Sequence, residues 1–107
     1  MSFNLRVVSF DLNGTVTAEI TNAGSVDAHN VWVKVEVFSQ GTRVLLNGKD
    51  FLRVDVGTLK TGETATQQGS SGIGPLDAVK IMQNGAHFDL AVNSDEGTQV
   101  FTYDYKP

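Results

Sequence analysis

Strict alternation of apolar and polar residues is the feature that most limits how this chain can fold. In three separate segments every second residue is apolar: residues 15–21, 31–38 and 87–92. Because successive side chains of a β-strand point to opposite faces, each segment would have one dry face and one wet face. Antiparallel sheets with one solvated face show such alternation, whereas strands of buried parallel sheets are apolar on both faces. The pattern therefore predicts antiparallel sheets around an apolar layer.

The remaining segments predict further strands and turns. The run 3–12 changes phase at Val7-Val8, and Asn13-Gly14 after it is a strong hairpin signal. A simple two-residue turn would leave the apolar faces mismatched, so we expect a three-residue loop or a bulge in this hairpin. The preferred register pairs Val8, Phe10 and Leu12 with Ile20, Ala18 and Val16. Other strands are expected at residues 44–46, 51–59, 64–68 and 99–105, and a flexible loop at 69–74.

One short helix is expected over residues 75–84. Pro75 suits the first helical position, where its missing N–H needs no partner, and Gly85 suits a helix end. The apolar residues of this helix recur at a spacing of three: Leu76, Val79 and Met82. About ten residues make a marginal helix in isolation, so we expect this stripe to dock on the sheets, with Trp32 and Phe38 as candidates for what it covers.

About seven short strands at steady spacing with Gly- and Asn-rich turns predict an all-β fold. The expected architecture is an immunoglobulin-like antiparallel β-sandwich with the helix between its late strands. The 107 residues fit one domain, 1–107, and 40% hydrophobic with 19% charged residues is a globular composition.

Composition excludes several classes of function. The net charge of −4 argues against nucleic-acid binding, and the lack of cysteine excludes disulfides, thiol nucleophiles and zinc–thiolate sites. No apolar run is long enough for membrane insertion, and the N-terminus lacks the apolar block of a signal peptide. We expect either a cytoplasmic protein or a domain of a longer exported chain to which Met1 has been added.

Three segments resemble one known family in the order in which they occur. They are "ITNAGSVDAHNVWVKV", "VGTLKTGETAT" and "GAHFDLAVNSD". This order is similar to that of CARDB-like, cell-adhesion-related domains of bacterial and archaeal surface proteins, and FxLyD-like domains share much of it. The helical segment 69–84 and the tail 96–107 depart from the family pattern. The resemblance implies a sandwich fold and an extracellular or cell-surface location within a longer chain.

The same segments supply six candidate structural residues: Asn22, Gly24, Asn30, Gly62, Glu63 and Gly85. Asn22 and Asn30 bracket a loop, where Asn side chains bond to backbone groups that strands leave unpaired. Gly24 between them is able to supply a positive φ angle. We therefore expect this polar cluster to fasten a strand corner, with a ligand site as the alternative.

Catalytic and metal-binding patterns are weak. A hydrolase built from Ser70 or Ser71 with His87 is weighed against a flexible loop, and the loop is preferred because no orienting acid or oxyanion hole is evident. For metal, Asp27 with His29 lacks a third ligand, and the acidic residues near Asn93 are typical of a solvated turn. We expect no enzymatic activity, no cofactor and no metal.

A binding surface is the remaining candidate site. Trp32 and Phe38 lie opposite the valines of residues 31–38, and His87 lies on a polar strand face. Aromatic residues exposed together would suit a protein or glycan partner. The aromatic residues of the last strand either join them or point inward, and we favour the inward arrangement: Phe101, Tyr103 and Tyr105. Asn13 satisfies a glycan acceptor rule but is equally a plain turn residue.

These observations favour a non-enzymatic structural, adhesion or protein-interaction module of a prokaryotic surface or secreted protein. Its partners would be an unidentified protein or glycan, and neighbouring domains of a larger parent protein. Three alternatives stay open: a cytoplasmic stress-protective sandwich of the LEA or water-stress type, a carbohydrate-binding module, and pairing through a sheet edge, which would give concentration-dependent oligomers.

Overall fold

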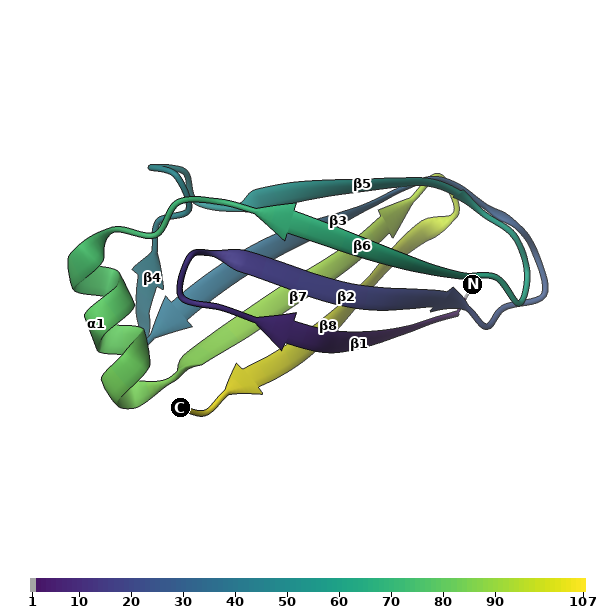
Figure 1. Ribbon diagram of the computed structural model, residues 1–107. Coiled ribbons are helices and arrows are strands. Elements are labelled where there is room, and N and C mark those ends of the chain that lie inside the picture. The colour runs from purple at the N-terminus through teal and green to yellow at the C-terminus, as the bar shows by residue number, and fades with distance from the viewer. Residues whose placement is uncertain (1) are drawn as a thin grey trace.

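Two antiparallel sheets and one helix form the fold in the computed structural model, which describes residues 2–107 (Figure 1). The smaller sheet has the order β1-β2-β6, with strands β1 (Phe3–Phe10), β2 (Thr15–Asn22) and β6 (Thr64–Ser70). The larger sheet contains β3 (Ala28–Ser39), β4 (Thr42–Val44), β5 (Leu52–Leu59), β7 (Ala86–Ser94) and β8 (Gly97–Tyr105). The immunoglobulin-like sandwich is confirmed, with eight strands in place of about seven.

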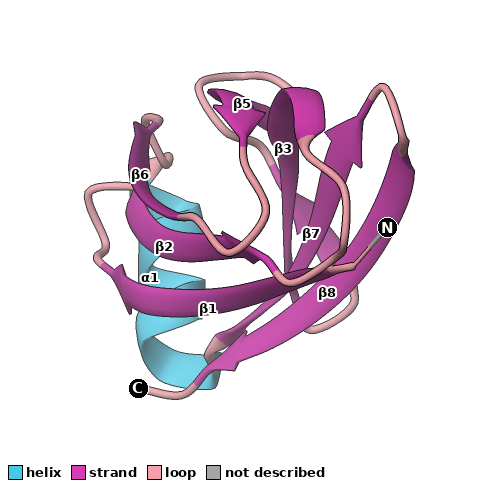
Figure 2. Cartoon of the chain, turned by 90° about the vertical axis from the view of Figure 1, so that its right-hand side faces the viewer, coloured by secondary structure: helices cyan, strands magenta, loops and turns pink. Residues whose placement is uncertain are grey.

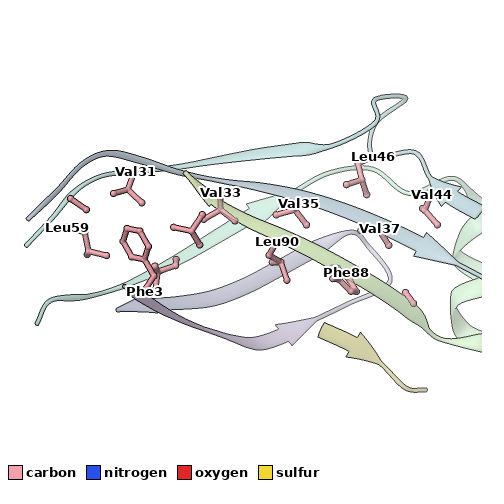
Figure 3. Close-up of a cluster of buried hydrophobic side chains, with 14 of the residues drawn as sticks. Phe3, Val31, Val33, Val35, Val37, Val44, Leu46, Leu59, Phe88 and Leu90 are labelled. Atoms are coloured by element: carbon pink, nitrogen blue, oxygen red, sulfur yellow. The ribbon is translucent and has the colours of Figure 1, made fainter. Parts of the chain in front are cut away.

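β3 is the central strand of the larger sheet. It pairs with β7 on one side, and on the other side with β5 and then β4, while β8 follows β7 at the edge. Its alternating valines are the buried residues that the sequence pattern predicts: Val31, Val33, Val35 and Val37. They face apolar side chains of the smaller sheet across the core (Figure 3). Each such side chain stabilises the fold by roughly 2 kcal/mol when removed from water.

The first hairpin contains the expected bulge, at the predicted phase change. Val7 pairs with Ala18 and Ser9 pairs with Thr17, so Val8 is the extra residue, and it is 46% exposed. The bulge turns Phe10 back toward the core, opposite Val16. The predicted pairing of Phe10 with Ala18 was therefore wrong. The extra residue Val8 brings the apolar side chains on both sides of it to the core face, so the whole hairpin does not need to shift. Residues 11–14 form the turn.

The helix, α1 (Pro75–Asn84), has the predicted bounds but not the predicted orientation. The helix lies at one end of the sandwich in Figure 1, and in Figure 2 it is seen behind β1 and β2. Ile81 is its fully buried residue, while the expected docking stripe is exposed: Leu76 80%, Val79 43% and Met82 52%. The expected cover over Trp32 and Phe38 was therefore wrong. Within residues 2–107, no helix has both the length and the apolar content needed to cross a membrane.

Gly69 and Ser70 belong to β6, so the loop expected at residues 69–74 begins later than predicted. A Cβ atom on Gly69 would lie 2.7 Å from a methyl carbon of Val54 and 2.9 Å from one of Leu52. The missing side chain thus lets β6 lie close to β5 and closes that side of the sandwich. The prediction of a loop at residues 69–74 rested on glycine content and did not include this packing role of Gly69.

Candidate functional site

The polar corner predicted around Asn22 is held by hydrogen bonds to backbone groups. Asn22 is 1% exposed, and its Nδ2 donates to the carbonyl oxygens of Val26 and Leu59 at 2.9 Å each. Its Oδ1 accepts the Gly24 N–H at 3.0 Å. All the hydrogen-bonding atoms of this amide therefore bond to backbone, as is required of a buried polar group.

The Gly62-Glu63 corner joins the same cluster. The Gly62 N–H donates to the Asn22 carbonyl at 2.8 Å, and the Asn22 N–H donates to the Glu63 carbonyl at 3.0 Å. Gly62 has φ of 80°, a conformation that glycine adopts without steric cost. The expectation that Gly24 supplies a positive φ was wrong: among the described residues of this corner, that role falls to Gly62 and Asn30, which has φ of 53°.

Asn30 faces the β7–β8 turn. Its Nδ2 donates to Oδ2 of Asp95 at 2.7 Å. Beside it, Nδ1 of His29 lies 2.9 Å from Oε2 of Glu96, and the His29 N–H donates to Oε1 of the same carboxylate at 2.7 Å. The hydrogen bond to Glu96 raises the pKa of His29, and the backbone hydrogen bond from His29 lowers the pKa of Glu96. These contacts tie the turn to β3.

The candidate binding residues lie on the outer face of the larger sheet. Phe38 and His87 are directly opposite each other on β3 and β7. Trp32 is six residues away along β3, about 20 Å at the rise of a strand, so the structure separates it from the other two. Each aromatic ring on β3 carries a guanidinium: Cζ of Arg53 is 4.1 Å from the Trp32 centroid, and Cζ of Arg43 is 4.9 Å from that of Phe38.

His87 is held between two carboxylates. Its Nδ1 lies 2.8 Å from Oδ1 of Asp104 and its Nε2 lies 2.9 Å from Oδ1 of Asp89. These hydrogen bonds, that to Asp104 first, raise the pKa of His87. The two acids were missed in the sequence, although Asp89 shares the face of His87 at a spacing of two, and Asp104 follows from the register of the last hairpin.

A hollow of about 570 Å³ lies beside this imidazole. Its walls come from the β3–β4 turn, the end of α1, the start of β7 and the end of β8. They combine an aromatic ring with hydrogen-bonding side chains: Phe38, Gln40, Asn84, His87, Asp89 and Asp104. Tyr105 lines the hollow at the end of β8. Gly85 also lines the hollow with φ of 78°, and a Cβ there would lie 2.4 Å from the Tyr105 carbonyl oxygen. Gly85 therefore lets the end of β8 approach the start of β7.

The aromatic residues of β8 point inward, as favoured. They are partly buried and pack against the core: Phe101, Tyr103 and Tyr105. Tyr105 makes an edge contact with Phe10 at 5.2 Å between centroids, and Tyr103 makes one with Phe88 at 5.7 Å. These rings therefore stabilise the sandwich.

The weighed catalytic and metal-binding sets are not assembled. The Ser70 hydroxyl lies 3.1 Å from that of Thr15, and the Ser71 N–H donates to the Gly14 carbonyl, while His87 bonds to its two aspartates. Oδ1 of Asp27 accepts the Thr61 N–H, whereas His29 bonds to Glu96. In the part of the chain that the structure describes, no three His, Cys, Asp or Glu side chains converge on a common metal position.

A comparison with known protein families identifies the family of the chain. The pattern of a family described as the archaeal immunoglobulin-like domain matches residues 12–106. The chain belongs to this family. Membership of the archaeal immunoglobulin-like domains supports the prediction of an immunoglobulin-like domain of prokaryotic proteins. Immunoglobulin-like domain families are generally non-catalytic. No curated protein matches the chain.

Proposed function

We propose that this archaeal immunoglobulin-like domain is a non-enzymatic interaction module of a surface or secreted protein, and that the Phe38–His87 hollow is its contact site. The observation that carries the proposal is the contrast among its polar clusters. The amide of Asn22 bonds only to backbone, whereas the side chains around His87 bond to one another at the rim of an open hollow. A rigid sheet that presents such groups is suited to recognition.

A glycan is the ligand class that the hollow favours among those considered. Apolar sugar faces stack on aromatic rings, and sugar hydroxyls bond to carboxylates and amides. Phe38 provides an aromatic ring, and Asp89, Asp104 and Gln40 provide hydrogen-bonding groups. The resemblance to CARDB-like domains supports the adhesion role and the surface location, and FxLyD-like domains would imply a similar setting. A stress-protective protein would need no such hollow.

Glycan-array binding followed by calorimetry on the strongest glycan tests the ligand class. Phe38→Ala should weaken binding at least about tenfold, because truncation of a central aromatic contact commonly costs more than 1 kcal/mol. Leu76→Ala is the matched control, since Leu76 is 80% exposed and lies outside the hollow. An equal loss of glycan affinity in both variants, or binding to no glycan, would reject the hypothesis of a carbohydrate ligand.

The location requires its own measurement. An antibody against the domain should label intact cells of the native organism, and external protease should remove the label. Labelling that appears only after cell lysis would reject the surface proposal, whatever the array shows.

A further inference from the structure

β8 is a long, uninterrupted strand with a free edge. It pairs with β7 over all nine residues from Gly97 to Tyr105 without a bulge, and within residues 2–107 no strand forms a ladder on its other side. β1 of the opposite sheet contacts β8 through the Phe3 backbone N–H, which donates to the side-chain Oε1 of Gln99 at 2.8 Å. A row of backbone N–H and C=O groups in the plane of the larger sheet is therefore available for another strand.

The outward-facing backbone groups follow from the hairpin geometry. Ser94 and Gly97 are the first directly opposed pair beyond the two-residue turn, and alternate residues of an antiparallel strand bond to opposite neighbours. The residues whose backbone groups face the free edge are Thr98, Val100, Thr102 and Asp104. The first three are β-branched, and Val100 is 63% exposed.

The remaining edge strands carry features that hinder edge pairing. β1 has a bulge at Val8, β4 is three residues long, and β5 has shifts in its pairing with β3 and bears Arg53 and Asp55. Gly69 draws β6 against β5. β8 has no charged residue between Gly97 and Tyr103, and its Asp104 is bonded to His87. Charges, bulges and short strands are the usual protections of an edge, and β8 lacks them along most of its length.

We infer that β8 binds the β8 strand of a second copy of this chain, antiparallel and about a two-fold axis. Full overlap of the two strands places Phe101 opposite its equivalent at the axis. The outward-facing groups then pair Thr98 with Asp104 and Val100 with Thr102. The pairing would join the two larger sheets into one continuous sheet and cover more of the half-exposed aromatic row of β8.

Charges favour this register over the slip that pairs Val100 with its own equivalent. Full overlap brings Lys106 of each copy level with Glu96 of the other, at the end of the β7–β8 turn. A slip that pairs Val100 with its own equivalent would instead bring Asp104 level with Glu96. Like charges directly opposite each other destabilise strand pairing, and opposite charges stabilise it. A second copy thus has a complementary partner surface in β8 itself.

Sedimentation from micromolar to millimolar protein concentration tests the dimer. The mass should rise reversibly from 11.5 kDa toward twice that value. Val100→Lys and Thr102→Pro should each weaken the dimer at least about tenfold, because the first places a charge on the edge and the second removes a donor from each copy. Leu76→Lys, a matched change on α1, should leave it unaltered. Near-ultraviolet circular dichroism checks that each variant folds.

Cysteine cross-linking tests the register, and the chain contains no cysteine of its own. Opposed residues of a hydrogen-bonded pair lie about 5.5 Å apart at Cα, within the range of a disulfide. A mixture of Val100→Cys and Thr102→Cys chains should cross-link faster than either variant alone. A monomer at every concentration, a dimer broken by Leu76→Lys but not by Val100→Lys, or faster cross-linking of one variant alone would each overturn the proposal.

Discussion

The two ends of the sandwich use similar polar residues in different ways. At the end away from α1, the buried Asn22 bonds to backbone groups of Val26, Leu59 and the exposed Gly62-Glu63 corner. At the α1 end, His87, Asp89 and Asp104 bond through their side chains on an open surface. The first arrangement completes backbone hydrogen bonds that strands leave unpaired, and the second presents groups to solvent.

This difference indicates that the bonding partner, more than the residue type, decides whether a polar side chain has capacity left to bind a ligand. A buried amide whose atoms all bond to backbone has no capacity left for a ligand. An exposed imidazole between carboxylates exchanges its hydrogen bonds with water and ligands at little cost. The two ends should therefore respond differently to mutation, and three tests measure that difference.

The largest effect is expected at the buried corner. Asn22→Ala should lower the free energy of unfolding by about 3–4 kcal/mol, because it leaves the buried Leu59 carbonyl and neighbouring backbone groups without their partner. Urea unfolding followed by tryptophan fluorescence measures it. Asn13→Ala, in the exposed turn of the first hairpin, is the control and should cost far less. Equal losses would remove the distinction between the corner and an ordinary turn.

A smaller loss of stability is expected from a substitution at Gly85, where the start of β7 lies close to the end of β8. Gly85 has φ of 78° and ψ of −173°, and its Cβ would clash with the Tyr105 carbonyl. Gly85→Ala should therefore cost about 2–3 kcal/mol.

Gly41 offers a matched control at φ of 77°, with no atom within 4 Å of its Cβ position. Gly41→Ala should cost only about 1 kcal/mol for the left-handed backbone. If the two alanine variants unfold at the same urea concentration, the close approach at Gly85 has no energetic importance.

The smallest effect is expected from pH. The folded-state pKa of both histidines is raised above 6.5, so their contribution is fully present below pH 6.5 and is lost as pH rises through the folded-state pKa. The lowered pKa of Glu96 acts oppositely: its contribution is present above pH 4.5 and is lost as pH falls through the folded-state pKa.

Melting temperatures across this pH range should therefore decline on the alkaline side, modestly because both imidazoles are exposed. His87→Gln and His29→Gln should each remove part of the decline, which assigns it to one end of the sandwich. A melting temperature that rises through neutral pH would contradict the assigned direction.

The fold could be predicted from sequence where a residue pattern is compatible with only one local structure. Period-two alternation gave the buried valines of β3, and Pro75 with Gly85 gave the bounds of α1. The predicted docking face of α1 was wrong: the apolar residues at a spacing of three stay exposed, and the fully buried residue of the helix is Ile81. Ile81 belongs to the hydrophobic core, and the sequence of the helix alone does not show which of its sides faces that core.

The candidate site was less predictable. His87 was named as a surface residue, but the hollow beside it arises where α1, β3, β7 and β8 come together, and no single segment carries that information. Asp89 could have been found from its spacing to His87. Asp104 required the register of the β7–β8 hairpin, which depends on the turn between the strands.

The position of β3 at the centre of the larger sheet also affects how the chain emerges from a ribosome. Every ladder that β3 forms is with a strand that is synthesised later: β4, β5 and finally β7. The edge of β3 that pairs with β7 therefore has no partner strand until nearly the whole domain has been translated. Such distant pairing slows folding and leaves nascent chains open to aggregation, so a slowly translated message would place the greatest demand on chaperones at this strand.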